Sequence, residues 1–161
     1  QGEQDVFSLF HYETWTKPLI LKCKGGGHPK LIQTLSGLLL SKVPMGKIAG
    51  VIPVPPTEPE TQDHGFYIAE ALAVLTGSAF RTDVLEKVKA SNSPQKTLNI
   101  DLRAQVTFRR LQNLPADEGV WLLVDDVITT GLTLLRASRA LGDTPVLCLT
   151  LASRPYVLVN P

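Results

Sequence analysis

Short apolar runs alternate with helical spacing along most of this chain. Runs of strand length occupy residues 6–11, 50–56, 78–82, 120–124 and 146–151. Apolar residues three and four positions apart predict helices near residues 31–39, 65–75 and 134–141. Pro29 suits the first turn of the first of these helices, and Gly77 suits the end of the second.

The alternation predicts an α/β fold in one domain. Strands separated by helices favour a mostly parallel, twisted sheet flanked by helices. The run 120–124 is continuously apolar, which is typical of a strand covered on both faces. In such sheets ligands bind outside the carboxyl ends of the strands, so we expect Pro55, Asp125 and Thr129 to lie at one edge.

One long segment breaks the pattern. Residues 85–112 are polar and rich in lysine and arginine, and they keep no sustained period. A stretch of this length without a recognisable element is either functional or mobile. We therefore interpret residues 84–112 as a mobile loop segment.

Composition narrows the class of protein only slightly. Hydrophobic residues make up 43% and charged residues 19%, which indicates a globular chain rather than a disordered one. The net charge of +1 does not favour a nucleic-acid binder, although a local basic patch stays open. No run approaches a membrane span, and the polar first residues do not resemble a signal peptide, so we expect a cytoplasmic protein. The chain does not begin with Met, which leaves open whether a segment precedes it.

The two cysteines are expected to be reduced, buried thiols. Cys23 and Cys148 form no Cys-x-x-Cys pair, so a thiolate zinc site within the chain is not predicted. A disulfide needs the fold to bring them together, and spacing alone does not decide that.

The candidate chemistry follows the continuously apolar run. Asp125 and Asp126 come directly after it, and Thr129-Thr130-Gly131 then opens a helix with Thr133 in its first turn. A helix N-terminus offers unpaired N–H groups and a partial positive charge, which bind phosphate. Gly131 allows close approach of the backbone, and carboxylates accept hydrogen bonds from a diol. An acid pair with a phosphate loop predicts a ribose-phosphate site.

Two plainer interpretations compete with this one. Paired Asp residues at a strand end also occur in metal-binding receiver domains, which lack the Thr-Thr-Gly-x-Thr loop. Thr129 or Thr130 alone would also suit a helix cap. Capping accounts less well for the threonines and the acids as a set.

The stretch from Leu122 to Leu134 resembles the signature of type I phosphoribosyltransferases. The order of secondary motifs resembles that of ComF-like members, related to amidophosphoribosyltransferases, over about residues 12–154. Those motifs are Pro53-Val54-Pro55, His64-Gly65-Phe66, and Ser93-Pro94-Gln95 followed by Arg103. The resemblance implies the type I phosphoribosyltransferase fold: a small hood with the first helix over about residues 1–45, and a core over 46–154.

The resemblance also implies a function. Active relatives bind phosphoribosyl pyrophosphate with magnesium and transfer the phosphoribosyl group to an acceptor, here unknown. Asp125 and Asp126 would be the catalytic acids. The ribose 5-phosphate site would consist of Asp125, Asp126, Val127, Ile128, Thr129, Thr130, Gly131 and Thr133. Val54, Pro55 and Pro56 match the pyrophosphate loop, and magnesium would bind through pyrophosphate and water without a direct protein ligand.

The chain departs from the family pattern at several points. His64-Gly65-Phe66-Tyr67-Ile68 stands where Arg-Gly-Phe-Asn-Gln is usual, and an Asn expected after Arg103 is absent. The cysteine-rich zinc module of many members is also missing. The alternative is therefore a catalytically weak or inactive adaptor of ComF type, acting with competence machinery in DNA uptake or single-stranded DNA handling. A ligand-sensing regulator and a homodimer stay open too.

Other side chains are weaker candidates. Lys22, Lys87 or Lys89 would supply a cation to the pyrophosphate loop, because proline offers no N–H, although each also suits a solvated surface. Gln95 and Arg103 are candidates for closing the mobile segment over the ligand. His64 suits a general acid by its chemistry, and equally a structural position. Tyr67 and the two tryptophans are most simply packing residues.

Overall fold

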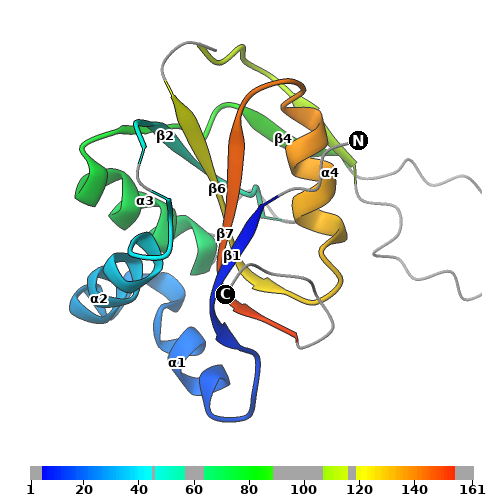
Figure 1. Cartoon of the computed structure of the whole chain (residues 1–161). Coiled ribbons are helices and arrows are strands. Elements are labelled where there is room, and N and C mark those ends of the chain that lie inside the picture. The colour runs from blue at the N-terminus through cyan, green and yellow to red at the C-terminus, as the bar shows by residue number, and fades with distance from the viewer. Residues whose placement is uncertain (1–4, 45, 57–63, 89–106, 116–118, 155–161) are drawn as a thin grey trace, which may run out of the picture.

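A computed structural model describes residues 5–44, 46–56, 64–88, 107–115 and 119–154. Within these ranges the chain is an α/β protein built around one five-stranded sheet (Figure 1). The strands are β1 (Val6–His11), β2 (Ile48–Pro53), β3 (Ala79–Phe80), β6 (Val120–Ile128) and β7 (Val146–Ser153). Their spatial order is β1-β7-β6-β2-β3, and neighbouring strands pair in parallel throughout. The mostly parallel sheet predicted from the apolar runs is confirmed.

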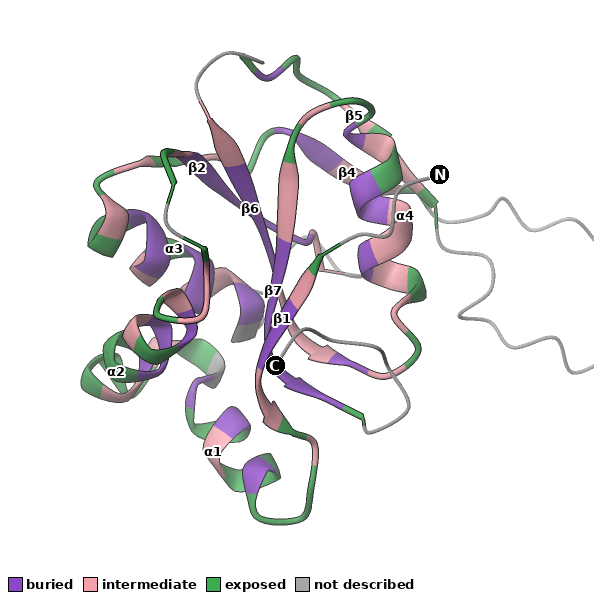
Figure 2. Cartoon of the chain, in the orientation of Figure 1, coloured by how far each residue is buried: buried purple, intermediate pink, exposed green. Residues whose placement is uncertain are grey.

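Helices cover both faces of the sheet (Figure 1). One face packs against α1 (Thr16–Lys22), α2 (Pro29–Leu40) and α3 (His64–Thr76). The other face packs against α4 (Leu132–Ala140) and the hairpin formed by β4 (Leu85–Val88) and β5 (Thr107–Arg110). Figure 2 shows the central strands as the most continuously buried part of the molecule.

The predicted helix signals fall where the structure has helices. Pro29 is in the first turn of α2, where its missing N–H costs nothing because that group has no partner in a helix start. Gly77 has a φ of 61° directly after α3, a left-handed conformation that ends a helix at little cost to glycine. The short helix α1 carries no clear period, and it was not predicted.

Two strands that were not predicted lie at the ends of the segment 85–112, and the mobile-loop interpretation of residues 89–106 falls outside the described residues. β4 and β5 pair antiparallel, with Leu85 opposite Arg110 and Val88 opposite Thr107. Leu85 and Arg110 share one face of the hairpin, on which Leu85 is buried against the α4 side of the sheet, while Glu86 and Arg109 share the other face. The four-residue strands are too short for their period to stand out.

Two strands also extend further than predicted. β7 continues to Ser153, and β6 continues through the two acids to Ile128. Asp125, Val127 and Ile128 pair with Thr150, Ala152 and Ser153 of β7. Because its backbone pairs with β7, β6 continues beyond the end of its apolar run.

The connections of the sheet diverge between β2 and β6. From β2 the chain passes through α3 to β3, at one edge of the sheet. From β6 it passes through α4, on the opposite face, to β7 on the other side. Ligands of open α/β sheets bind where neighbouring connections diverge in this way, at the carboxyl ends of the two strands.

Both cysteines are free and buried, as predicted. Cys23 belongs to the cluster on the α2 and α3 face, and Cys148 to the cluster on the α4 face. In the described part of the chain, no helix has the length and apolar character needed to cross a membrane.

Candidate functional site

The two acids of β6 lie where the regular alternation of side chains between the two faces of the sheet shifts. Leu123 and Ile128 pack on the α4 face and Val124 and Val127 on the α3 face, and the charge of Asp125 acts on Cys148, which belongs to the α4 face. Each is half-buried and accepts a bond from the next backbone N–H, over 2.9 Å from Asp126 N to Asp125 Oδ1 and 2.6 Å from Val127 N to Asp126 Oδ1. The acids are therefore not equivalent members of a pair.

Beyond β6 the chain turns tightly into α4. Gly131 has a φ of 76°, and its carbonyl accepts the first helical bond, from Leu135 N at 2.9 Å. Thr130 Oγ1 accepts a hydrogen bond from Leu132 N over 3.4 Å, but the N-cap residue is Gly131 and no side chain caps α4, so the capping interpretation is not supported. Thr133 lies in the first turn of α4, as predicted.

A small hollow lies between the strand end and this turn. It measures about 20 Å³, room for a single water molecule. Its lining comprises Asp125, Val127, Ile128, Thr129, Thr130, Gly131, Thr133 and Leu134. These include every residue of the predicted ribose 5-phosphate site except Asp126, so Asp125 is the acid that lies with the loop. A group as large as phosphate would sit at the mouth of the hollow, at the start of α4.

The predicted pyrophosphate loop lies beside the acids. Val54 N donates to Val124 O over 2.8 Å, and Pro53 is the partner of Val124 in the β2–β6 register. Pro55 and Pro56, both half-buried, continue from this point. Residues 70 positions apart in the sequence are thus brought together at the carboxyl ends of adjacent strands, as the strand-end argument predicted.

The first turn of α3 also lies against the acids. A Cβ atom added at Gly65 would come within 3.3 Å of Asp125 Cα and of Asp126 N. Glycine therefore lets α3 begin this close to β6, since a Cβ atom here would require the backbone of β6 to give by a few tenths of an ångström. His64, the first residue of α3, is at the same end of the helix, and its side chain lies outside the described part.

The charge of Asp125 contributes to the pKa of a buried thiol, that of Cys148. Burial, and secondarily the negative charge of Asp125, raise the pKa of the Cys148 thiol to about 12. The thiol therefore stays protonated at neutral pH and does not serve as a nucleophile. Burial likewise raises the pKa of Cys23.

The other predicted contacts are spread over the molecule. Lys22, exposed, ends α1 on the α3 side, whereas Lys87 lies on the β4–β5 hairpin on the α4 side. Lys89, Gln95 and Arg103 fall outside the described residues. Tyr67 packs as predicted: its ring lies against Gly26, where an added Cβ would come within 2.7 Å of ring atom Cε1.

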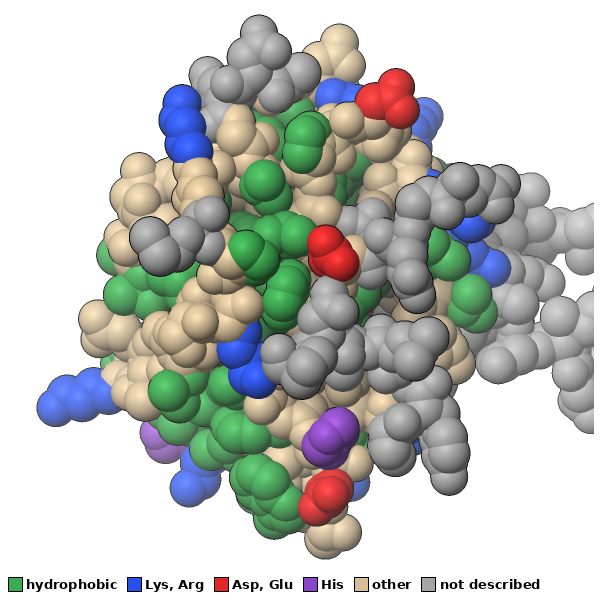
Figure 3. All heavy atoms as spheres, viewed as in Figure 1, with side chains coloured by type: hydrophobic (Ala, Val, Ile, Leu, Met, Phe, Trp, Pro, Cys, Tyr) green, Lys and Arg blue, Asp and Glu red, His purple; other side chains and the backbone are tan. Residues whose placement is uncertain are grey.

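Two cations of the basic segment are engaged within the fold. Arg109 pairs with Glu86 across the hairpin, with Nη2 and Oε2 2.5 Å apart. Arg110 donates from Nη1 to Leu141 O over 2.8 Å and from Nε to Gln112 O over 2.9 Å. On the face in Figure 3, lysine and arginine side chains are dispersed among apolar and neutral ones. These observations lend no separate support to the DNA-handling alternative.

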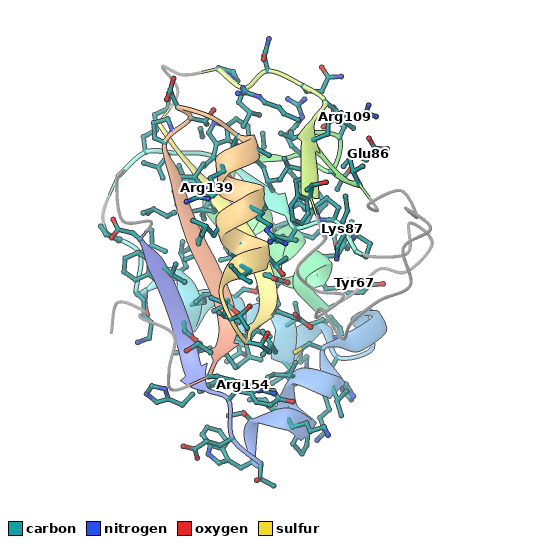
Figure 4. The ribbon with its side chains drawn as sticks, turned by 90° about the vertical axis from the view of Figure 1, so that its right-hand side faces the viewer. Tyr67, Glu86, Lys87, Arg109, Arg139 and Arg154 are labelled. Carbon is teal, nitrogen blue, oxygen red and sulfur yellow. The ribbon has the colours of Figure 1, made fainter. Side chains whose placement is uncertain are left out.

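Sequence reasoning missed one residue at this edge of the sheet. Arg154 follows β7 directly, and its backbone N–H donates to Ile128 O over 3.0 Å, at the start of the phosphate-loop candidate. Its side chain is exposed (Figure 4). No local motif marks this arginine, and only the β6–β7 register, which pairs Ile128 with Ser153, brings it to the loop.

The comparisons with known proteins give no family for the chain: no protein-family model and no curated protein sequence matches it. Within the described ranges, no group of three or more His, Cys, Asp or Glu side chains is arranged to hold a metal ion.

Proposed function

We propose that this protein binds a ribose 5-phosphate compound at Asp125–Thr133, foremost phosphoribosyl pyrophosphate, and transfers the phosphoribosyl group to an acceptor. On this proposal the chain is a ComF-like member of the type I phosphoribosyltransferases, with their fold. One observation carries it. The strand, acid, tight turn and helix start that resemble the family signature are continuous, and they lie where the connections of β2 and β6 diverge.

The division of labour follows from the residue types. Backbone N–H groups in the first turn of α4 and the hydroxyls of Thr129 and Thr133 hold the 5′-phosphate at the mouth of the hollow. Asp125 accepts hydrogen bonds from the ribose hydroxyls. Its negative charge also favours the positive charge that develops at the anomeric carbon. The bond from that carbon to pyrophosphate breaks, the acceptor forms the new bond, and the acceptor's proton leaves with solvent or a base.

The site would hold magnesium through the bound pyrophosphate rather than through direct protein ligands. Carboxylate oxygens are hard ligands that suit this ion, but among the described residues no group of three or more His, Cys, Asp or Glu side chains could hold it. The ion would reach the site with the pyrophosphate and its own water shell. When bound there it would offset the charge of the leaving pyrophosphate.

The pyrophosphate end of the site has the weaker support. Pro55 and Pro56 donate no N–H, so the loop after β2 is a poor anion cradle on its own. A cation from another element has to complete it.

Isothermal titration with phosphoribosyl pyrophosphate and magnesium tests the proposal. We expect wild-type protein to bind and Asp125→Asn to bind roughly 10–100-fold more weakly, since hydrogen bonds to charged groups contribute about 1.5–3 kcal/mol each. Asp143→Asn is the matched control, because Asp143 is an exposed acid at the opposite end of α4. Absence of binding to wild-type protein at millimolar ligand would refute the proposal, as would equal effects of the two substitutions.

A further inference from the structure

Arg154 is placed by the sheet beside the loop that enters α4. The hydrogen bond from Arg154 N to Ile128 O fixes its backbone against the last residue of β6. Thr129 and Thr130, which line the hollow, follow Ile128 directly. Figure 4 shows Arg154 below the lower end of α4, where the loop enters that helix, and Arg139 nearer its far end. Backbone pairing therefore fixes the position of Arg154, and its side chain is exposed.

The Arg154 side chain has no hydrogen bond or ion pair with any described residue. Arg81, Arg109 and Arg110, in contrast, each bond a carboxylate or a carbonyl oxygen. Ser153, directly before Arg154, carries a fully buried hydroxyl that also lacks a partner. Because buried polar groups are nearly always paired, this end of β7 holds hydrogen-bonding capacity that the described chain does not use.

The strand order decides which end of a ligand Arg154 could meet. β6 lies between β7 and β2, so Arg154 and the Val54–Pro56 loop flank the site from opposite sides. Arg154 adjoins the turn at Thr129–Gly131, whereas the Val54 loop adjoins the predicted pyrophosphate position. Arg154 is thus on the 5′-phosphate side of the proposed site.

We propose that Arg154 is the cation that pairs with the 5′-phosphate of a ligand held at Asp125–Thr133. This inference rests on the proposed function and assigns it a specificity-determining residue. A guanidinium matches two phosphate oxygens with two parallel N–H bonds, which a lysine cannot do. It would add a charge to a loop whose other donors are neutral N–H and hydroxyl groups.

Titration of the Arg154→Gln variant with two ligands tests this assignment. Ribose 5-phosphate carries only the 5′-phosphate, and phosphoribosyl pyrophosphate carries both anionic groups. Arg154→Gln is expected to weaken both ligands by the same factor, about tenfold for one charge-assisted contact near solvent. Arg154→Lys should recover part of the loss. Arg139→Gln, an exposed arginine in the last turn of α4, should change neither affinity.

Each other outcome overturns the assignment in a different way. A loss confined to phosphoribosyl pyrophosphate would move Arg154 to the pyrophosphate. Unchanged binding of ribose 5-phosphate, with circular dichroism showing a folded variant, would remove its role and leave the proposed function intact. Failure of the wild-type protein to bind either ligand would overturn both proposals together.

Discussion

At the scale of single residues, some positions require glycine because a larger side chain would clash with closely packed neighbours, and not because the backbone needs the conformational freedom of glycine. A Cβ at Gly50 would fall against the six-membered ring of Trp121 and within 2.8 Å of Ala79 O. Trp121 is almost fully buried and is the largest side chain of the core on the α4 face. Gly50 therefore makes room for Trp121, and the two positions are coupled.

A pair of glycine substitutions tests this coupling. Gly50→Ala should lower the free energy of unfolding by about 1–3 kcal/mol or more, because the new methyl group overpacks a rigid core. Gly37→Ala should raise it by about 0.5–1 kcal/mol, since Gly37 lies inside α2 with nothing within 4 Å of its added Cβ. Urea unfolding of both variants provides the measurement. A Gly50→Ala variant as stable as wild type would contradict the packing account.

The Cys148 thiol predicts a stability loss at alkaline pH. Its pKa is raised to about 12 in the folded chain, against about 9 when the thiol is exposed. Between these values the unfolded chain has lost the proton and the folded chain has kept it, so rising pH favours unfolding. The contribution is roughly 1.4 kcal/mol per pH unit from about pH 9 upward.

Urea unfolding between pH 8 and 11 checks this dependence. Because lysines and tyrosines titrate in the same range, the informative quantity is the difference in slope between wild type and Cys148→Ala. We expect the variant to have the shallower slope, whatever its stability at pH 7. Equal slopes would mean that the thiol is not protonated differently in the two states.

At the scale of elements, the β4–β5 hairpin is attached to the core by specific contacts. Arg110 binds the Leu141 carbonyl at the end of α4, an oxygen that also accepts a hydrogen bond from Thr144 Oγ1. Arg109, the neighbouring residue, only pairs with Glu86 within the hairpin and is largely exposed. One arginine therefore links two elements, and the other links two strands of the same element.

Replacing each arginine by Met separates the two roles. Arg110→Met should destabilise the protein by about 1–2 kcal/mol, because it removes the two hydrogen bonds that Arg110 donates to Leu141 O and Gln112 O. Arg109→Met should change stability by no more than about 0.5 kcal/mol, as expected for an exposed ion pair. Thermal unfolding monitored by circular dichroism measures both. Similar costs for the two variants would argue against a link through Leu141.

Prediction from the sequence succeeded where burial dictates the pattern. The apolar run before Asp125 is continuous, and apolar residues recur at helical spacing through α2 and α3. These elements can therefore be identified from the sequence. The extension of β6 through Asp125 to Ile128 could not be seen, because it depends on backbone bonds to β7 rather than on side-chain type. Arg154 was missed for the same reason: register across strands decides its place.

At the scale of the whole molecule, the proposed hood is part of the core. Ile20 and Cys23 from α1 and its end, with Leu35 and Leu39 of α2, pack in the same cluster as the buried residues of α3 and the central strands. β1 is held by its parallel pairing with β7. The boundary near residue 45 therefore separates segments of sequence but not independently packed units.

We expect residues 5–154 to unfold in one transition. Trp15 reports on the amino-terminal segment and is 60% exposed, whereas Trp121 is buried in the opposite face of the sheet. In variants that retain only one tryptophan, made by Trp121→Phe and Trp15→Phe, fluorescence and far-ultraviolet circular dichroism of the same variant should share a midpoint. A separate, earlier midpoint for Trp15 would mean that the hood opens independently.

The parallel pairing of β1 with β7 also determines how the chain resists a pulling force. β1 begins at Val6 and β7 ends at Ser153, so a force applied to the two chain ends draws these neighbouring strands in opposite directions along their length. The strand-to-strand bonds are then loaded together in shear rather than opened one after another. The fold should therefore be mechanically stiffer when pulled by its ends than its modest size suggests.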